Sequence, residues 1–272
     1  MATAKELFDQ GQLGAAIEAV TAEVKANPTD LKPRTFLFEL LCFAGDWDRA
    51  EKQIDVLAQQ SMESAVGVHV YRDNIKAERE RKRLFAEGAH PHFLVEPPAY
   101  IDVQLDAVGC LGRGDAAGAR ERLDRAEELR PALSGSWNGK AFGDFRDFND
   151  LTGPVLELIV KDKYAWLPFE QIRRIEFDPP KKLRDLVWMP ARIQAADQTT
   201  GEVYVPTLYA GSSEHADERV RLARMTDWKP VGEDAYVGSG PRVFLADDQE
   251  LSLLETRTVE LSGPAGAAGP PS

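Results

Sequence analysis

The sequence predicts an α+β fold, in which a tetratricopeptide-like array of helical hairpins is followed by a smaller strand-rich domain. Three observations predict it. A Gly, Ala and Pro spacing recurs along the 272-residue chain, apolar residues near it repeat every three or four positions, and short apolar runs bounded by Pro, Gly or Asp follow Pro131. We expect a helical domain over residues 1–132, a strand-rich domain over 133–261 and a disordered tail over 262–272.

The repeat consists of a glycine, an alanine five positions later and a proline seventeen positions after the glycine. Two full sets and one partial set occur: Gly11, Ala16 and Pro28; Gly114, Ala119 and Pro131; and Gly45 with Ala50. Gly45 follows Gly11 by 34 positions, the tetratricopeptide period. Glycine permits the tight turn between two helices, alanine lets their backbones approach, and proline stops the second helix. Asp46 and Asp115 are suited to cap the second helices.

The centre of the array departs from this period. The pattern predicts one long helix from Glu63 to Glu87, a break at the proline-containing segment 90–98, and a helix that resumes near Ala99. About seven helices are expected up to Arg130. Cys42 and Cys110 fall within apolar helical runs, so we expect both to be reduced core residues.

After Pro131 the pattern is that of strands. Asn138-Gly139 predicts a hairpin, and Asp150-Leu151-Thr152-Gly153-Pro154 predicts a short helix to about Lys161. Strands are expected at residues 164–167, 172–177, 186–188, 191–193, 203–205, 242–245 and 253–261.

Composition excludes several classes of partner. The formal net charge is -12, from 45 acidic and 33 basic residues, which argues against general binding to nucleic acid or anionic lipid. The N-terminus lacks the apolar core of a signal peptide, and no run approaches the length of a membrane span. We therefore expect a cytoplasmic protein without membrane insertion.

No phosphate loop, dinucleotide fingerprint, nucleophile elbow or zinc-ligand pair is present in the sequence, so we expect no cofactor, no metal and no catalytic residues. His90 and His92 fit a polar loop better than a metal site. Asp144, Asp147 and Asp150 fit a surface hairpin, with Asp150 as a helix cap, better than a cation site. The basic face of the long helix is expected to be solvated rather than a site for an acidic partner; it comprises Arg72, Lys76, Arg79 and Arg83.

A tetratricopeptide array presents a concave groove lined by the first helix of each hairpin, and such grooves receive peptides or helices. Counting from the turn glycines, the groove positions are Lys32, Thr35, Glu39, Cys42, Ile101, Gln104, Val108 and Leu111. They form either a protein-binding surface or, if the second domain closes the array, ordinary core. The sequence leaves both open.

Three runs of residues resemble the TagJ family, also called ImpE or SciE-type proteins: 34–51, 183–192 and 221–228. The resemblance is colinear from about residue 4 to 260. It implies an accessory protein of the bacterial type VI secretion machine, which binds the small subunit of the contractile sheath through that subunit's N-terminal helix and is associated with the ClpV ATPase that disassembles sheaths. It implies no catalytic residues.

The leading hypothesis is therefore a non-enzymatic adaptor between the sheath and the ClpV ATPase. A cytosolic chaperone or scaffold for another component of the same machine is the alternative. An enzyme is the third, with the carboxylates around Asp147 as its only plausible centre.

Overall fold

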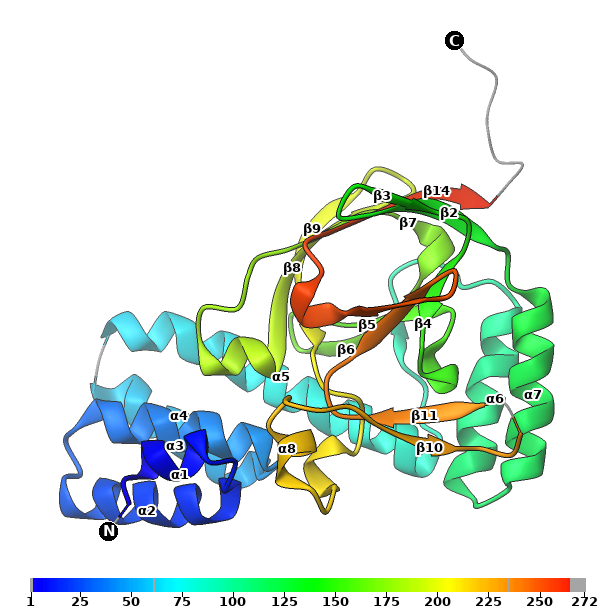
Figure 1. Cartoon of the computed structure of the whole chain (residues 1–272). Coiled ribbons are helices and arrows are strands. Elements are labelled where there is room, and N and C mark those ends of the chain that lie inside the picture. Colours follow the sequence, from blue (N-terminus) through cyan, green and yellow to red (C-terminus); the bar gives the residue numbers. More distant parts are fainter. Residues whose placement is uncertain (1, 61, 234, 265–272) are drawn as a thin grey trace.

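The computed structural model describes residues 2–60, 62–233 and 235–264, and it shows helices followed by strands (Figure 1). In the described chain before residue 130, seven α-helices occur: α1 (Ala4–Asp9), α2 (Leu13–Ala26), α3 (Leu31–Phe43), α4 (Trp47–Gln60), α5 (Met62–Glu87), α6 (Tyr100–Gly112) and α7 (Ala116–Leu129). The contacts pair α1 with α2, α3 with α4, and α6 with α7. The predicted array, its seven helices and the long helix α5 are confirmed.

The repeat residues lie where the spacing predicts. Gly11, Gly45 and Gly114 have φ values of 81°, 67° and 79°, which L side chains rarely adopt. The alanines five positions later are fully buried between helices, at Ala16, Ala50 and Ala119. The two predicted caps are also present, because Asp46 accepts a hydrogen bond from Arg49 N and Asp115 accepts one from Gly118 N.

The strand-rich region is built on a nine-stranded sheet with the order β1-β6-β5-β9-β8-β7-β14-β2-β3. Its strands are β1 (His92–Phe93), β2 (Leu133–Trp137), β3 (Lys140–Phe142), β5 (Val155–Val160), β6 (Lys163–Pro168), β7 (Ile172–Phe177), β8 (Trp188–Ala195), β9 (Thr200–Pro206) and β14 (Thr258–Pro264). All pairs are antiparallel except β1 with β6. The β2–β3 hairpin turns at Asn138-Gly139, as predicted.

Two smaller sheets complete the region. The three-stranded sheet β13-β12-β4 joins β4 (Phe145–Asp147), β12 (Val243–Ala246) and β13 (Gln249–Ser252), and lies within the curve of the large sheet (Figure 1). A separate ribbon pairs β10 (Asp227–Pro230) with β11 (Tyr236–Ser239). Short helical segments connect the strands: η1 (Asp150–Thr152), η2 (Phe169–Gln171), η3 (Leu183–Leu186), η4 (Ser212–Glu214), α8 (Glu218–Arg221) and η5 (Leu253–Glu255).

The structure corrects three expected elements. Of the strand expected at residues 186–188, Leu186 ends η3 and Trp188 begins β8, which continues through the strand expected at 191–193. The helix predicted from Asp150 to Lys161 ends after the single turn η1, because the apolar run Val155–Val160 pairs as strand β5 with β6 along its whole length. The strand expected at residues 253–261 begins as η5 and becomes β14, which continues to Pro264, beyond the expected start of the tail. The remainder of that expected tail, 265–272, lies outside the described residues.

Strand β5 shows how the layers share a core. Leu156 and Leu158 join the apolar cluster between the large and the three-stranded sheets, whereas Val155 and Ile159 join a second cluster that continues into the helices. Because successive side chains of a strand point to opposite faces, β5 is buried on both sides. The second cluster therefore contains side chains from both predicted domains, and Cys42 and Cys110, both free thiols, lie within it.

Candidate functional site

The face of α3 that was expected to line a groove is partly covered by η3. Lys32 is exposed and Thr35 is half-buried near the start of the helix, but Glu39 is only 8% exposed. Its Oε1 accepts a hydrogen bond from Arg184 Nη1 at 2.9 Å. Burial raises the pKa of Glu39, and Arg184 opposes this rise. The strand-rich region therefore already supplies the cation that faces Glu39.

The corresponding face of α6 is covered by η1. Ile101, Gln104 and Val108 are buried, and Gln104 Nε2 donates a hydrogen bond to the carbonyl oxygen of Asp150 at 2.5 Å. Leu111, one turn further on, is half-buried. Intramolecular contacts occupy the side chains of Glu39, Ile101 and Gln104, as in the alternative in which the second domain closes the array. Their place in a protein-binding surface stays a prediction.

A cleft of about 390 Å³ remains where the C-terminal ends of α3 and α6 meet the segment 208–214. Its apolar lining comes mainly from the helices and includes Trp47, Phe85, Val108 and Leu111. This volume falls within the range of about 300–1,000 Å³ typical of ligand pockets. The cleft therefore preserves the far end of the predicted groove, although the strand-rich region now forms its second wall.

The rim of this cleft is polar. Lys82 of α5 and Glu214 of η4 form an ion pair of 2.9 Å between Nζ and Oε1, and both side chains are about two-thirds exposed. An ion pair this exposed contributes little to stability. It leaves charged groups beside an apolar hollow, as at the edge of a protein-binding surface.

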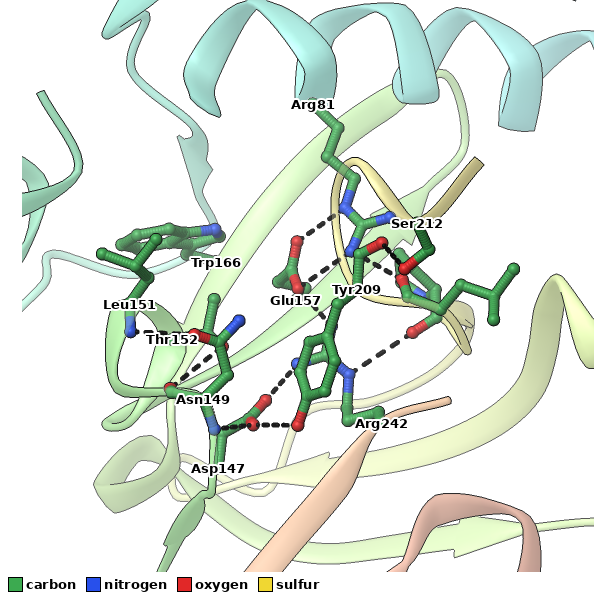
Figure 2. A network of polar contacts seen from close by, with 12 residues as sticks. Arg81, Asp147, Asn149, Leu151, Thr152, Glu157, Trp166, Tyr209, Ser212 and Arg242 are labelled. Carbon is green, nitrogen blue, oxygen red and sulfur yellow. Dashed lines mark hydrogen bonds and ion pairs between the residues drawn. The ribbon is translucent and has the colours of Figure 1, made fainter. Parts of the chain in front are cut away.

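The polar groups on the inner side of the cleft belong to a buried ionic network (Figure 2). Arg81 of α5 donates through Nε and Nη2 to the two oxygens of Glu157 on β5, at 2.7 and 3.1 Å, and Nη2 also donates to the carbonyl oxygen of Leu208 at 2.8 Å. Tyr164 OH donates to Glu157 as well, at 2.5 Å. One carboxylate thus ties the longest helix of the array to the large sheet.

Arg242 extends the network to the three-stranded sheet. Its guanidinium, which is 0% exposed, forms ion pairs with both Glu157 and Asp147. Asp147 Oδ1 also accepts hydrogen bonds from Tyr209 OH at 2.7 Å and from Asn149 N at 2.9 Å. Figure 2 shows Arg81, Asp147, Glu157, Tyr209 and Arg242 converging from separate parts of the chain.

Opposite charges within the network stabilise the ionised forms of Arg81 and Glu157 despite their burial. Burial opposes ionisation of Arg81, but Glu157 and Glu78 raise its pKa above the ordinary value. Burial alone would raise the pKa of Glu157, yet Arg81 and Arg242 lower it to about 2. Burial raises the pKa of Asp147, with Arg242 opposing the rise. The network cross-links three elements behind the cleft, and its carboxylates are committed to donors within the chain.

The structure also corrects the interpretation of the Asp144, Asp147 and Asp150 cluster. Asp147 is fully buried rather than on a surface hairpin. The cap of η1 is Asn149, which accepts from Leu151 N, and Asp150 instead pairs with Arg146. These carboxylates therefore have different partners. Asp144, for example, pairs with Arg130.

The basic face of α5 meets acidic partners from the same chain. Arg72 pairs with Asp55, Lys76 with Asp162, and Arg79 with Asp48 and Glu51. Each of these cations keeps a substantially exposed side chain. The face is thus solvated, as expected, but it also helps to hold α4 and the β5–β6 turn.

The sequence did not predict this network, whose members are Arg81, Glu157, Tyr209 and Arg242. One signal was available, because Glu157 interrupts the otherwise apolar run Val155–Val160 and Arg242 precedes the apolar strand β12. A charge inside a buried strand is usually paired. Within the described residues, no three His, Cys, Asp or Glu side chains gather as metal ligands. No α-helix among those residues combines the length and the apolar character that crossing a membrane requires.

The comparisons with known proteins extend over both regions. A family model described as ImpE protein matches residues 139–260. The type VI secretion system accessory component TagJ of Pseudomonas aeruginosa is 33% identical over 257 residues, which cover 94% of this chain and 90% of that protein. This chain belongs to the TagJ/ImpE family.

A solved structure shares the complete fold. The crystal structure of protein VPA1032 from Vibrio parahaemolyticus superposes with a TM-score of 0.87 at 26% identity, and the match covers 95% of this chain and 97% of that one. The arrangement of helices and strands in this TagJ/ImpE protein is therefore also found in a second protein.

Proposed function

We propose that this protein is a non-enzymatic, cytoplasmic accessory component of a type VI secretion system. In this proposal it binds the N-terminal helix of the small contractile-sheath subunit and links the sheath to the ClpV disassembly ATPase. Support comes from its membership of the TagJ/ImpE family and from its similarity to a type VI secretion accessory component.

The observation that carries the binding proposal is the cleft lined by Trp47, Phe85, Val108 and Leu111. An amphipathic helix binds when its apolar side chains enter a hollow and its polar side chains meet the rim. A cleft of about 390 Å³ has room for a few apolar side chains from such a helix. Lys82 and Glu214 would then offer opposite charges to its polar face. Lys32 and Thr35 lie near the other end of α3 and do not line this cleft.

The ionic network supports a binding role over a catalytic one. Asp147, at the centre of the carboxylate cluster that was the candidate catalytic site, is bound by Arg242, Tyr209 and the backbone of Asn149. A catalytic acid or base must reach its substrate within hydrogen-bond distance. These contacts instead give Asp147 a structural role, in which it helps to fix the wall of the cleft.

Calorimetry with the purified small sheath subunit tests the first part of the proposal. We expect saturable 1:1 binding to the intact subunit and loss of binding when its N-terminal helix is deleted. Equal binding of the truncated subunit would place the contact elsewhere on that partner. Absence of binding to either form would favour the alternative, a scaffold for another component of the machine.

The link to the ATPase needs a separate experiment. Size-exclusion chromatography of ClpV with the small sheath subunit should show more co-elution when this protein is added. Unchanged co-elution would remove the linking role and leave the sheath contact intact.

A further inference from the structure

A second cleft, of about 410 Å³, lies between α5 and the strands β5, β7, β8 and β9. It shares Glu176, Arg192 and Glu202 with a shallower hollow of about 470 Å³ that continues towards Thr200 at the β8–β9 hairpin. Because the two hollows share these residues, they form one elongated trough. An extended chain of several residues fits such a shape better than a compact ligand does.

Asn74 of α5 is an unexplained polar group in the lining of this cleft. It is 1% exposed, and its Nδ2 has no hydrogen-bond partner among the described residues. A buried donor without a partner is destabilising, and it is uncommon in folded proteins unless it serves a purpose. The carboxamide of asparagine can donate one hydrogen bond and accept another, which matches the N–H and C=O groups of a peptide backbone.

The charges around the cleft favour a basic occupant. Four carboxylates line it against two cations, namely Asp73, Glu176, Asp178 and Glu202 against Lys161 and Arg192. Glu176 is already held by Arg174 at 2.8 Å and by Arg192 at 3.2 Å. Asp178 Oδ2 also lies 4.0 Å from Lys181 Nζ. With Arg174, which lines the shallower hollow, the trough as a whole has four carboxylates against three cations, so it keeps a negative excess of one charge.

We propose that this trough binds an extended segment of a partner protein that carries lysine or arginine side chains. In the bound state the Asn74 side chain turns towards the trough and its carboxamide hydrogen-bonds to a peptide group of that segment, while Asp73, Asp178 and Glu202 receive its cations. The trough and the apolar cleft assigned to the sheath helix are lined by different residues. A test of the trough proposal is therefore independent of the proposed sheath contact.

Fluorescence anisotropy with the full-length protein tests the proposal. The probe is a labelled peptide of about ten residues that alternates lysine with alanine, because alternate side chains of an extended chain share one face. A matched peptide alternates glutamate with alanine. We expect the basic probe to bind about tenfold or more tightly than the acidic one, and to weaken as salt is added. Equal binding of the two peptides would overturn the proposal.

Two variants locate the binding. Asn74→Leu keeps the volume and removes the carboxamide, so affinity for the basic probe should fall about tenfold, with no decrease in melting temperature. Glu202→Gln, at an exposed position that leaves the core intact, should weaken binding severalfold. Leu111→Asp, in the apolar cleft, is the control and should bind the probe like wild type. Wild-type affinity in both Asn74→Leu and Glu202→Gln would overturn the proposal.

Nuclear magnetic resonance gives a direct readout of the orphan amide. The side-chain NH₂ signals of Asn74, identified by their loss in Asn74→Leu, should move when the basic peptide is added, because Nδ2 gains an acceptor. If these signals stay in place while the peptide binds, the peptide lies elsewhere and the assignment is wrong.

Discussion

Arg242 shows what single residues contribute to this molecule. Its guanidinium is buried between Asp147 and Glu157, which lie 95 and 85 positions away in the sequence. The sequence could indicate that a charge next to an apolar strand needs a partner. It could not indicate which carboxylate, because the pairing depends on how three sheet segments and α5 come together.

Removing this cation should be far more harmful than removing a surface one. Arg242→Met leaves two buried carboxylates without their shared partner, and we expect a loss of about 3–5 kcal/mol of unfolding free energy. The matched control is Arg192→Met, whose side chain is 60% exposed in its pair with Glu176, with an expected loss below about 1 kcal/mol. Urea denaturation of both variants measures the difference, and similar losses would contradict the role given to the network.

The network also predicts an acid dependence. Burial alone would raise the pKa of Glu157, but Arg81 and Arg242 lower it to about 2, below its ordinary value of 4.5. The ionised carboxylate therefore stabilises the fold fully above pH 4.5, and this stabilisation is lost as the pH falls towards 2. Between about pH 6 and about pH 3, the unfolding free energy of wild type should fall by up to about 2 kcal/mol more than that of Glu157→Gln. Parallel losses in urea titrations would show that Glu157 does not titrate in this window.

At the scale of elements, the helical hairpins were predictable because their signals are local. The turn glycines, buried alanines and aspartate caps act within one hairpin, and all appear at the predicted positions. The strand β5 was missed because Asp150 to Pro154 resembles a helix start, and only pairing with β6 makes Val155–Val160 extended. The sequence did not show that η1 and η3 contact the first-helix faces, because these segments come from distant parts of the chain.

The turn glycines provide a test with its own control. Gly45 and Gly114 both have positive φ, but a Cβ on Gly45 would lie 2.6 Å from Ser213 Oγ and 2.9 Å from Ser213 Cβ, whereas one on Gly114 would meet nothing within 4 Å. Gly114→Ala should lower the unfolding free energy by about 1 kcal/mol through backbone strain alone. Gly45→Ala should cost at least about 1 kcal/mol more, since the α3–α4 turn must move away from η4.

A double variant separates the two causes. Adding Ser213→Gly to Gly45→Ala should bring the loss close to that of Gly114→Ala, as judged by thermal melting. A double variant as unstable as Gly45→Ala would mean that the turn does not pack against η4.

At the scale of the whole molecule, we propose that residues 1–132 and 133–261 are two domains that fold cooperatively. One apolar cluster contains helix residues such as Phe43 together with sheet residues such as Trp166 and Trp188. Further contacts join α8 to the first hairpin, where Glu218 accepts from Gly14 N at 2.8 Å. Figure 1 shows α8 beside these N-terminal helices.

This coupling predicts a single unfolding transition. Helix content followed by far-ultraviolet circular dichroism and tryptophan packing followed by fluorescence should report the same urea midpoint, because neither region keeps its core when the other unfolds. Two separated midpoints would instead show that the helical and strand-rich regions are independently stable.

The most direct test of the account concerns the apolar cleft. Leu111 is half-buried and lines the cleft, and Leu129 is exposed on α7 outside it. Leu111→Asp should weaken binding of the small sheath subunit about a hundredfold, because a carboxylate would be desolvated against the apolar face of the partner helix. Leu129→Asp, the matched control, should bind like wild type. Calorimetry on variants with wild-type melting curves decides the matter: unchanged affinity in Leu111→Asp would contradict the account, since the sheath helix could not then lie in this cleft.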